Sequence, residues 1–146
     1  VSSISNLKKI MKKLFDPAPI LPDKILGVIR IVLGLLTVYH GQEVFQAELM
    51  NEYSKWAPFQ GSYGKLMVYV GKSCELLAGL LLTAGAYTRI GALFLIGALG
   101  YITFFVGQGR FWYEDQHPFM FVLLGVIYLF YGPGAWSVDA RLTKKN

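Results

Sequence analysis

Four apolar segments, each close to the length of a membrane span, constrain this chain more than any other feature. They cover residues 24–41, 65–87, 89–106 and 118–131. A helix needs about 20 apolar residues to cross a bilayer, so the fourth segment is short unless it starts a turn earlier. Backbone groups in lipid must be bonded internally, which favours helices for segments of this length. We therefore predict an all-α fold, a polytopic membrane four-helix bundle.

Charged residues are scarce and unevenly placed. They make up 16% of the chain, against about 25% in soluble proteins. Lysines and arginines gather before the first segment, in the turn after the second and in the tail, whereas the other two loops also carry acidic residues. Cytoplasmic flanks are rich in Lys and Arg, so we predict a prokaryotic cytoplasmic (inner) membrane protein with both termini cytoplasmic. The basic excess is then no sign of nucleic-acid binding.

The domain organisation is simple: residues 1–146 form a single domain. Residues 1–23 combine apolar residues at helical spacing with four lysines, which predicts an amphipathic helix on an anionic membrane surface. Residues 24–142 form the bundle. In the long loop after the first segment, a helical stripe ends before Pro58, which predicts a helix on the outer face; an irregular loop is the alternative. The stripe consists of Val44, Phe45, Leu49, Tyr53 and Trp56.

Glycines share one face on each predicted helix. Small residues allow helix backbones to approach closely in a membrane, so we expect these faces to be packing faces. The glycines concerned are Gly27, Gly34 and Gly41 on the first helix, Gly71 and Gly79 on the second, Gly97, Gly100 and Gly107 on the third, and Gly125 and Gly132 on the fourth. Charged residues on the same faces should then point into the bundle.

Four polar residues are the candidate site: Arg30 and His40 on the first helix, and Lys72 and Glu75 on the second. Ionisable residues within a membrane are costly and usually paired. We predict a direct or water-bridged contact between Arg30 and Glu75. One interpretation is an ion pair that fixes helix register. The other is a pocket that binds a ligand head group, such as a quinone carbonyl, or relays a proton.

The sequence gives little indication of a disulfide, a haem site, a metal site or a catalytic site. The single cysteine, Cys74, excludes an intrachain disulfide and is expected to pack within a helix. His40 and His117 could ligate a haem, and His40 with Glu43 and Glu75 a metal, but no spacing is typical of such sites, and we predict no metal. No nucleophile–base pair indicates catalysis, so no catalytic residue is assigned.

The end of the chain, Gly132-Pro133-Gly134-Ala135-Trp136-Ser137-Val138-Asp139, resembles the ending of the DoxX/DoxD family of small four-helix membrane proteins. Three further segments resemble the family in order. They are 30–41 in the first helix, 75–89 in the second helix and its turn, and 111–119 before the fourth helix. The resemblance covers roughly residues 24–142. Ala135 and Glu43 depart from it, because family members usually carry basic residues there.

The family resemblance implies two functions of different class. The first is a membrane subunit of a redox-linked complex that binds a quinone, its only expected cofactor, near the four polar residues; such a subunit would not be catalytic alone. The alternative is a non-catalytic accessory subunit of a larger membrane assembly. In both, the partners are the lipid bilayer and other membrane protein subunits.

The ending itself predicts a structural anchor. Gly132, Pro133 and Gly134 should end the fourth helix, and Trp136 should lie at the inner interface. Ser137 and Asp139 are expected to cap a new helix near residue 140.

Overall fold

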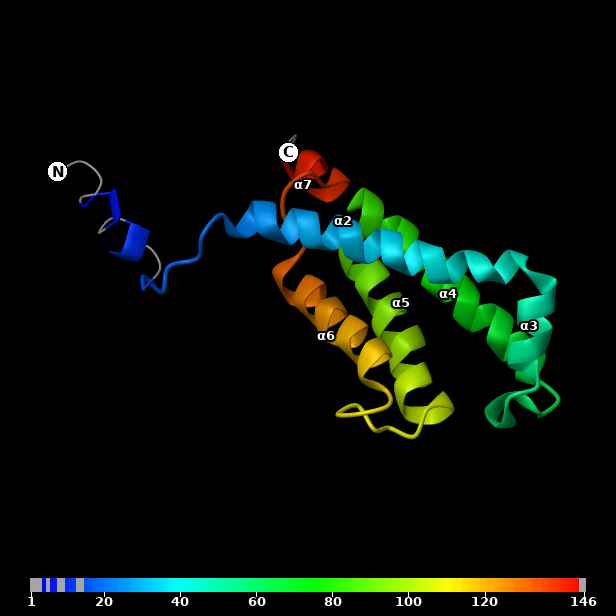
Figure 1. The fold of residues 1–146 in the computed structure, drawn as a ribbon. Coiled ribbons are helices and arrows are strands. Elements are labelled where there is room, and N and C mark those ends of the chain that lie inside the picture. The colour runs from blue at the N-terminus through cyan, green and yellow to red at the C-terminus, as the bar shows by residue number, and fades with distance from the viewer. Residues whose placement is uncertain (1–3, 5, 8–9, 13–14, 145–146) are drawn as a thin grey trace.

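The computed structural model describes residues 4, 6–7, 10–12 and 15–144, and the helices in this part of the chain form an antiparallel bundle (Figure 1). Its long helices are α2 (Pro22–Gly41), α4 (Gly64–Ala84), α5 (Thr88–Tyr101) and α6 (Gln116–Tyr131). The short elements are η1 (Gln42–Phe45), α3 (Ala47–Ser54), η2 (Ala57–Phe59), the π-helical η3 (Ile102–Val106) and α7 (Val138–Thr143). We call the two ends of the bundle the α3 end and the α7 end.

Among the described residues, three stretches are long and apolar enough to cross a membrane: Pro22–Phe45, Gly64–Ala84 and Thr88–Val106. The fourth helix, α6, begins two residues earlier than expected but has only 16 residues, about 24 Å at the helical rise. It is apolar and lies beside α5 (Figure 1). The prediction of an all-α membrane protein is confirmed, and these helices carry many exposed apolar side chains, as a lipid environment requires.

Close packing of α2 against α4 depends on glycine. A Cβ added at Gly34 would overlap Thr83, one at Gly41 would overlap Leu76, and one at Gly79 would lie 2.5 Å from the Val38 nitrogen. These glycines therefore pack as predicted, because any side chain would force the two backbones apart.

Two other glycines behave differently. A Cβ at Gly71 on α4 or Gly97 on α5 would meet nothing within 4 Å. Their assignment to packing faces was wrong, because the two glycines border open space rather than a neighbouring backbone. Gly132 was also wrongly assigned to a packing face, because it lies beyond the end of α6 and a Cβ there would meet nothing within 4 Å.

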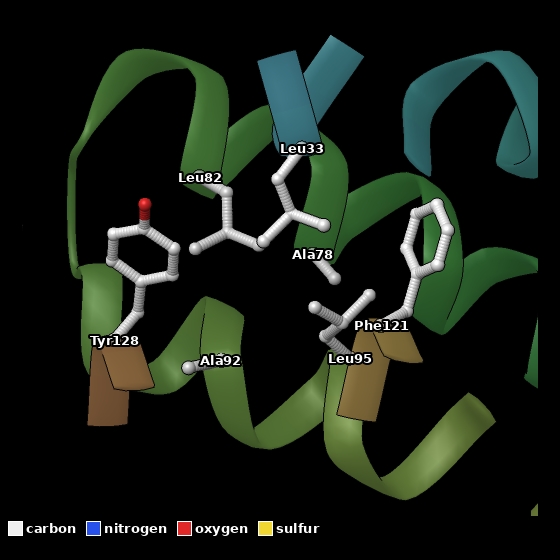
Figure 2. Close-up of a cluster of buried hydrophobic side chains, with 7 residues drawn as sticks. All are labelled: Leu33, Ala78, Leu82, Ala92, Leu95, Phe121 and Tyr128. Atoms are coloured by element: carbon white, nitrogen blue, oxygen red, sulfur yellow. The ribbon is translucent and has the colours of Figure 1, made fainter. Parts of the chain in front are cut away.

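The hydrophobic core joins all four long helices (Figure 2). It contains Leu33 from α2, Ala78 and Leu82 from α4, Ala92 and Leu95 from α5, and Phe121 and Tyr128 from α6. The Tyr128 hydroxyl donates a hydrogen bond of 2.8 Å to the carbonyl oxygen of Leu26, which ties α6 to α2.

Helix ends explain two differences from expectation. The second helix was expected to reach residue 87, but Gly85 adopts a left-handed conformation (φ 64°) and ends α4 three residues earlier. The loop helix forms as predicted, but in pieces, because Gln46 is extended between η1 and α3.

In the N-terminal segment, residues 10–12 are helical, whereas Lys8, Lys9 and Lys13 lie outside the described residues.

Candidate functional site

Arg30 is fully buried and binds backbone carbonyls. Nε donates to the Pro133 oxygen at 2.8 Å, and Nη2 donates to the oxygens of Ala135 and Trp136 at 3.2 and 2.9 Å. Nη1 donates to the carbonyl oxygens of Leu82 and Thr83, near the C-terminus of α4. The last carbonyls of a helix lack intrahelical donors and carry partial negative charge, so a guanidinium is well matched to them.

The predicted contact between Arg30 and Glu75 is therefore wrong. Glu75 lies about 10 Å before Leu82 along α4, given the helical rise. Side chains on a helix also tilt toward its N-terminus, and α2 and α4 are antiparallel. Arg30 consequently reaches toward the α7 end and Glu75 toward the α3 end.

Lys72 is the partner of Glu75. Its Nζ lies 3.0 Å from Oε2 of Glu75 and 2.9 Å from Oε2 of Glu43. The Tyr53 hydroxyl donates to the same Glu43 oxygen at 2.8 Å, and the ammonium lies 5.4 Å from the centre of the Tyr53 ring. We call these four residues the Lys72 cluster. It draws on α4, η1 and α3, so three elements meet around one half-buried cation between two carboxylates.

Burial raises the pKa of the Tyr53 phenol, and its hydrogen bond to Glu43 raises it further. Tyr53 therefore remains a protonated donor at neutral pH. Sequence reasoning weighed Glu43 only as a metal ligand with His40 and Glu75, and it did not assign Tyr53 to the site. The available signal was position, because Glu43 follows the end of α2 closely, on the same side of the bundle as Lys72.

A cavity of about 540 Å³ lies between α4 and α5 toward the α3 end, in the range of pockets for small organic ligands. Lys72, Glu75 and Tyr53 form its polar wall, and Gly71 and Gly97 create space because they carry no side chain. The remaining wall is almost entirely apolar. It comprises Trp56, Phe59, Leu66, Met67, Val68, Val70, Cys74, Leu93, Phe94, Ala98, Tyr101, Ile102 and Val106.

A change of helix type occurs at the edge of this cavity. The last turn of the third membrane segment is π-helical, from Ile102 to Val106, and both of these end residues line the cavity. Turns of π-helix are rare in proteins, and those that occur are often found at functional sites. The wider turn shapes this wall of the cavity.

His40 and His117 come together outside the cavity wall. Their rings, from α2 and α6, lie 5.9 Å apart in an edge-to-face arrangement. The backbone oxygen of His40 lies 3.5 Å from Lys72 Nζ. Within the described residues, no group of three or more His, Cys, Asp or Glu side chains is arranged to hold a metal ion.

The ending of the chain folds back on the α4–α5 turn at the α7 end. Ser137 caps α7 by accepting a hydrogen bond from the Ala140 nitrogen at 3.1 Å. Asp139 does not cap α7; its two oxygens accept from the nitrogens of Tyr87 and Thr88, each at 2.8 Å, at the start of α5. Burial alone would raise the pKa of Asp139, but these hydrogen bonds lower it below its usual value. We call this arrangement the tail clasp.

The other residues of the ending complete the tail clasp. Gly134 has φ 66°, and a Cβ there would lie 2.8 Å from the nitrogen of Gly27. Gly132 ends α6 with φ 86°, and Trp136 is exposed. Pro133 contributes the carbonyl that Arg30 binds.

Comparison with known proteins gives one family and one distant relative. The model of the DoxX family matches residues 25–108, which include Arg30, His40, Lys72 and Glu75 but not the ending. An uncharacterized protein of Haemophilus influenzae is 26% identical over 127 residues, which is 82% of this chain and 92% of that protein. No solved structure matches the chain.

Proposed function

Because the chain belongs to the DoxX family of membrane proteins, we propose that it is the quinone-binding membrane subunit of a redox-linked assembly. The observation that carries this proposal is the cavity of about 540 Å³ between α4 and α5, with Lys72 and Glu75 in an otherwise apolar wall. A quinone combines carbonyl acceptors with an apolar ring and tail, and the cavity offers a matching surface for each part.

The head group is expected beside the Lys72 cluster. An ammonium has three N–H donors, and two of them point at Glu43 and Glu75. The third donor makes only a long contact of 3.5 Å to the backbone oxygen of His40. It is therefore available to donate a hydrogen bond to a quinone carbonyl.

The tail is expected to leave the cavity toward lipid. Leu66, Met67, Val70 and Leu93 line the cavity and are also exposed on the outside of the bundle. An isoprenoid chain that passes between α4 and α5 would therefore remain in contact with apolar surface along its length.

The proposed orientation places the α3 end outside the cytoplasmic membrane and both termini in the cytoplasm. The basic residues Lys24, Arg89 and Arg141 lie at the α7 end or in the turn and tail beside it, which the positive-inside rule assigns to the cytoplasm. Electron donors or acceptors would belong to other subunits of the assembly.

Cys74 allows a direct test, because it lines the cavity and is the single cysteine of the chain. We expect decylubiquinone to slow the alkylation of Cys74 by N-ethylmaleimide in purified protein. Gly71→Leu should fill the cavity and abolish this protection, since a side chain there meets no neighbouring atom within 4 Å.

Ser73→Leu is the matched control, because Ser73 lies on the same helix, is exposed and does not line the cavity. It should retain the protection. Equal protection in the Gly71→Leu variant, or none in the unaltered protein, would contradict quinone binding in this cavity. Protein subunits that co-purify without quinone would then favour the accessory function.

A further inference from the structure

We propose that Glu75, Lys72 and Glu43 form a proton path between the cavity and water at the α3 end. This inference rests on the proposed quinone function and adds the route by which the bound quinone exchanges protons. It also assigns a role to Glu43, which does not line the cavity.

The three groups form a continuous series from inside to outside. Side-chain exposure rises from 3% for Glu75 to 14% for Lys72 and 20% for Glu43. The two intervening contacts are 3.0 and 2.9 Å, which are hydrogen-bond distances for an ammonium and a carboxylate. Lys72 holds Glu75 by Oε2, so Oε1 is the oxygen that can approach a ligand in the cavity.

The opposite end of the bundle offers no equivalent route through Arg30. The guanidinium keeps its proton at all physiological pH values and donates to five backbone carbonyls. Proton exchange with the cavity is therefore directed to the α3 end.

Other titratable groups surround the path. Tyr53 on α3 donates to Glu43 and acts as a fixed donor, because the pKa of its phenol is raised. His40 on α2 lies beside the path and pairs with His117 on α6, whereas Cys74 neighbours Glu75 on α4. Among the described residues, the contacts that connect Glu75 to Glu43 run through Lys72.

Quinone reduction takes up two electrons and two protons. A quinone that accepts two electrons from a flavin- or haem-bearing redox subunit forms two O–H bonds, and its two C=O groups become C–OH groups. In the resting state, Lys72 is an ammonium between two carboxylates. Lys72 passes one proton to Glu75, and the resulting carboxylic acid gives it to a quinone oxygen and becomes a carboxylate again. The neutral amine of Lys72 regains a proton from Glu43, which takes it up from water at the α3 end. The second proton repeats this sequence, and quinol oxidation reverses it.

The test uses the full chain in a bilayer supported on an electrode, which supplies the electrons, with decylubiquinone as the quinone. Voltammetry measures the reduction rate of protein-bound quinone above the signal of a protein-free bilayer. We expect Glu43→Gln to slow this rate on the order of 100-fold, the lower end for a positioned proton-transfer group. Quinone affinity, measured by protection of Cys74, should change less than about twofold, because Glu43 lies outside the cavity wall.

Two comparisons separate proton transfer from a structural effect. Glu48→Gln, which removes an exposed carboxylate on α3, should leave the rate unchanged. Formate, a small diffusible acid, should restore much of the rate in the Glu43→Gln variant, and Glu43→Asp should retain part of it. A Glu43→Gln variant that binds quinone and is reduced at the normal rate would overturn the path alone. Absence of quinone binding by the unaltered protein would overturn the proposed function as well.

Discussion

At the residue scale, Arg30 and the Lys72–Glu75 pair have separate roles. Arg30 organises backbone at the α7 end, where it joins the C-terminus of α4 to the loop before α7. Lys72 and Glu75 form an ion pair beside the cavity. Sequence spacing placed all of these groups within the bundle but could not pair them. The partners of Arg30 are carbonyl oxygens more than 50 residues away, and a carbonyl has no side-chain signature in a sequence.

This separation predicts additive effects. Because Arg30 and Glu75 share no partner, Arg30→Ala and Glu75→Ala should change the free energy of unfolding independently, within about 0.5 kcal/mol of additivity. Lys72→Ala and Glu75→Ala should instead show coupling of about 1 kcal/mol or more, since the two side chains are in direct contact and Lys72→Ala leaves the buried Glu75 carboxylate without its cation. Double-mutant cycles from denaturant unfolding in detergent provide the measurement. Coupling between Arg30 and Glu75 above about 1 kcal/mol would refute this assignment.

At the scale of elements, glycine spacing identified the packing of α2 against α4 but misplaced Gly71, Gly97 and Gly132. Gly34 and Gly79 contact a neighbouring backbone, whereas Gly71 and Gly97 border the cavity. Both situations produce the same small-residue face, so spacing cannot distinguish a helix contact from a cavity wall. The contact of Glu43 with Lys72 was missed for a related reason: Glu43 lies in the η1 turn after α2, where helical spacing no longer predicts direction.

The tail clasp predicts a pH dependence of stability. Hydrogen bonds from Tyr87 and Thr88 lower the pKa of Asp139 despite its burial. The stabilisation is therefore fully present above the ordinary aspartate pKa of about 4 and is lost as the pH falls through the lower folded value. Asp139→Asn should lower stability by about 1–2 kcal/mol at neutral pH, and the difference should shrink in acid.

Thermal unfolding of both proteins between neutral and acidic pH measures this effect. Glu48→Gln, which removes an exposed carboxylate, serves as the control. A stability difference between wild type and Asp139→Asn that is constant across this range would show that the charge of Asp139 does not support the clasp.

At the scale of the whole molecule, the long apolar segments were sufficient to predict the membrane class and the antiparallel order. The family resemblance rested instead on short motifs, and the DoxX model covers those at residues 30–41 and 75–89. The cavity could not be predicted, because its walls come from α4, α5 and the loop helices, whose separation depends on packing. Its position beside the Lys72 cluster is what links the fold to the proposed function.

The most direct test of that link is photo-crosslinking with an azido-quinone, followed by mass-spectrometric mapping of the labelled residues. We expect labels on α4 and α5 at cavity residues such as Cys74, Phe94 and Tyr101, and their loss when excess decylubiquinone competes. Labels spread over the exposed faces of α2 and α6, undiminished by the competitor, would contradict a quinone site between α4 and α5.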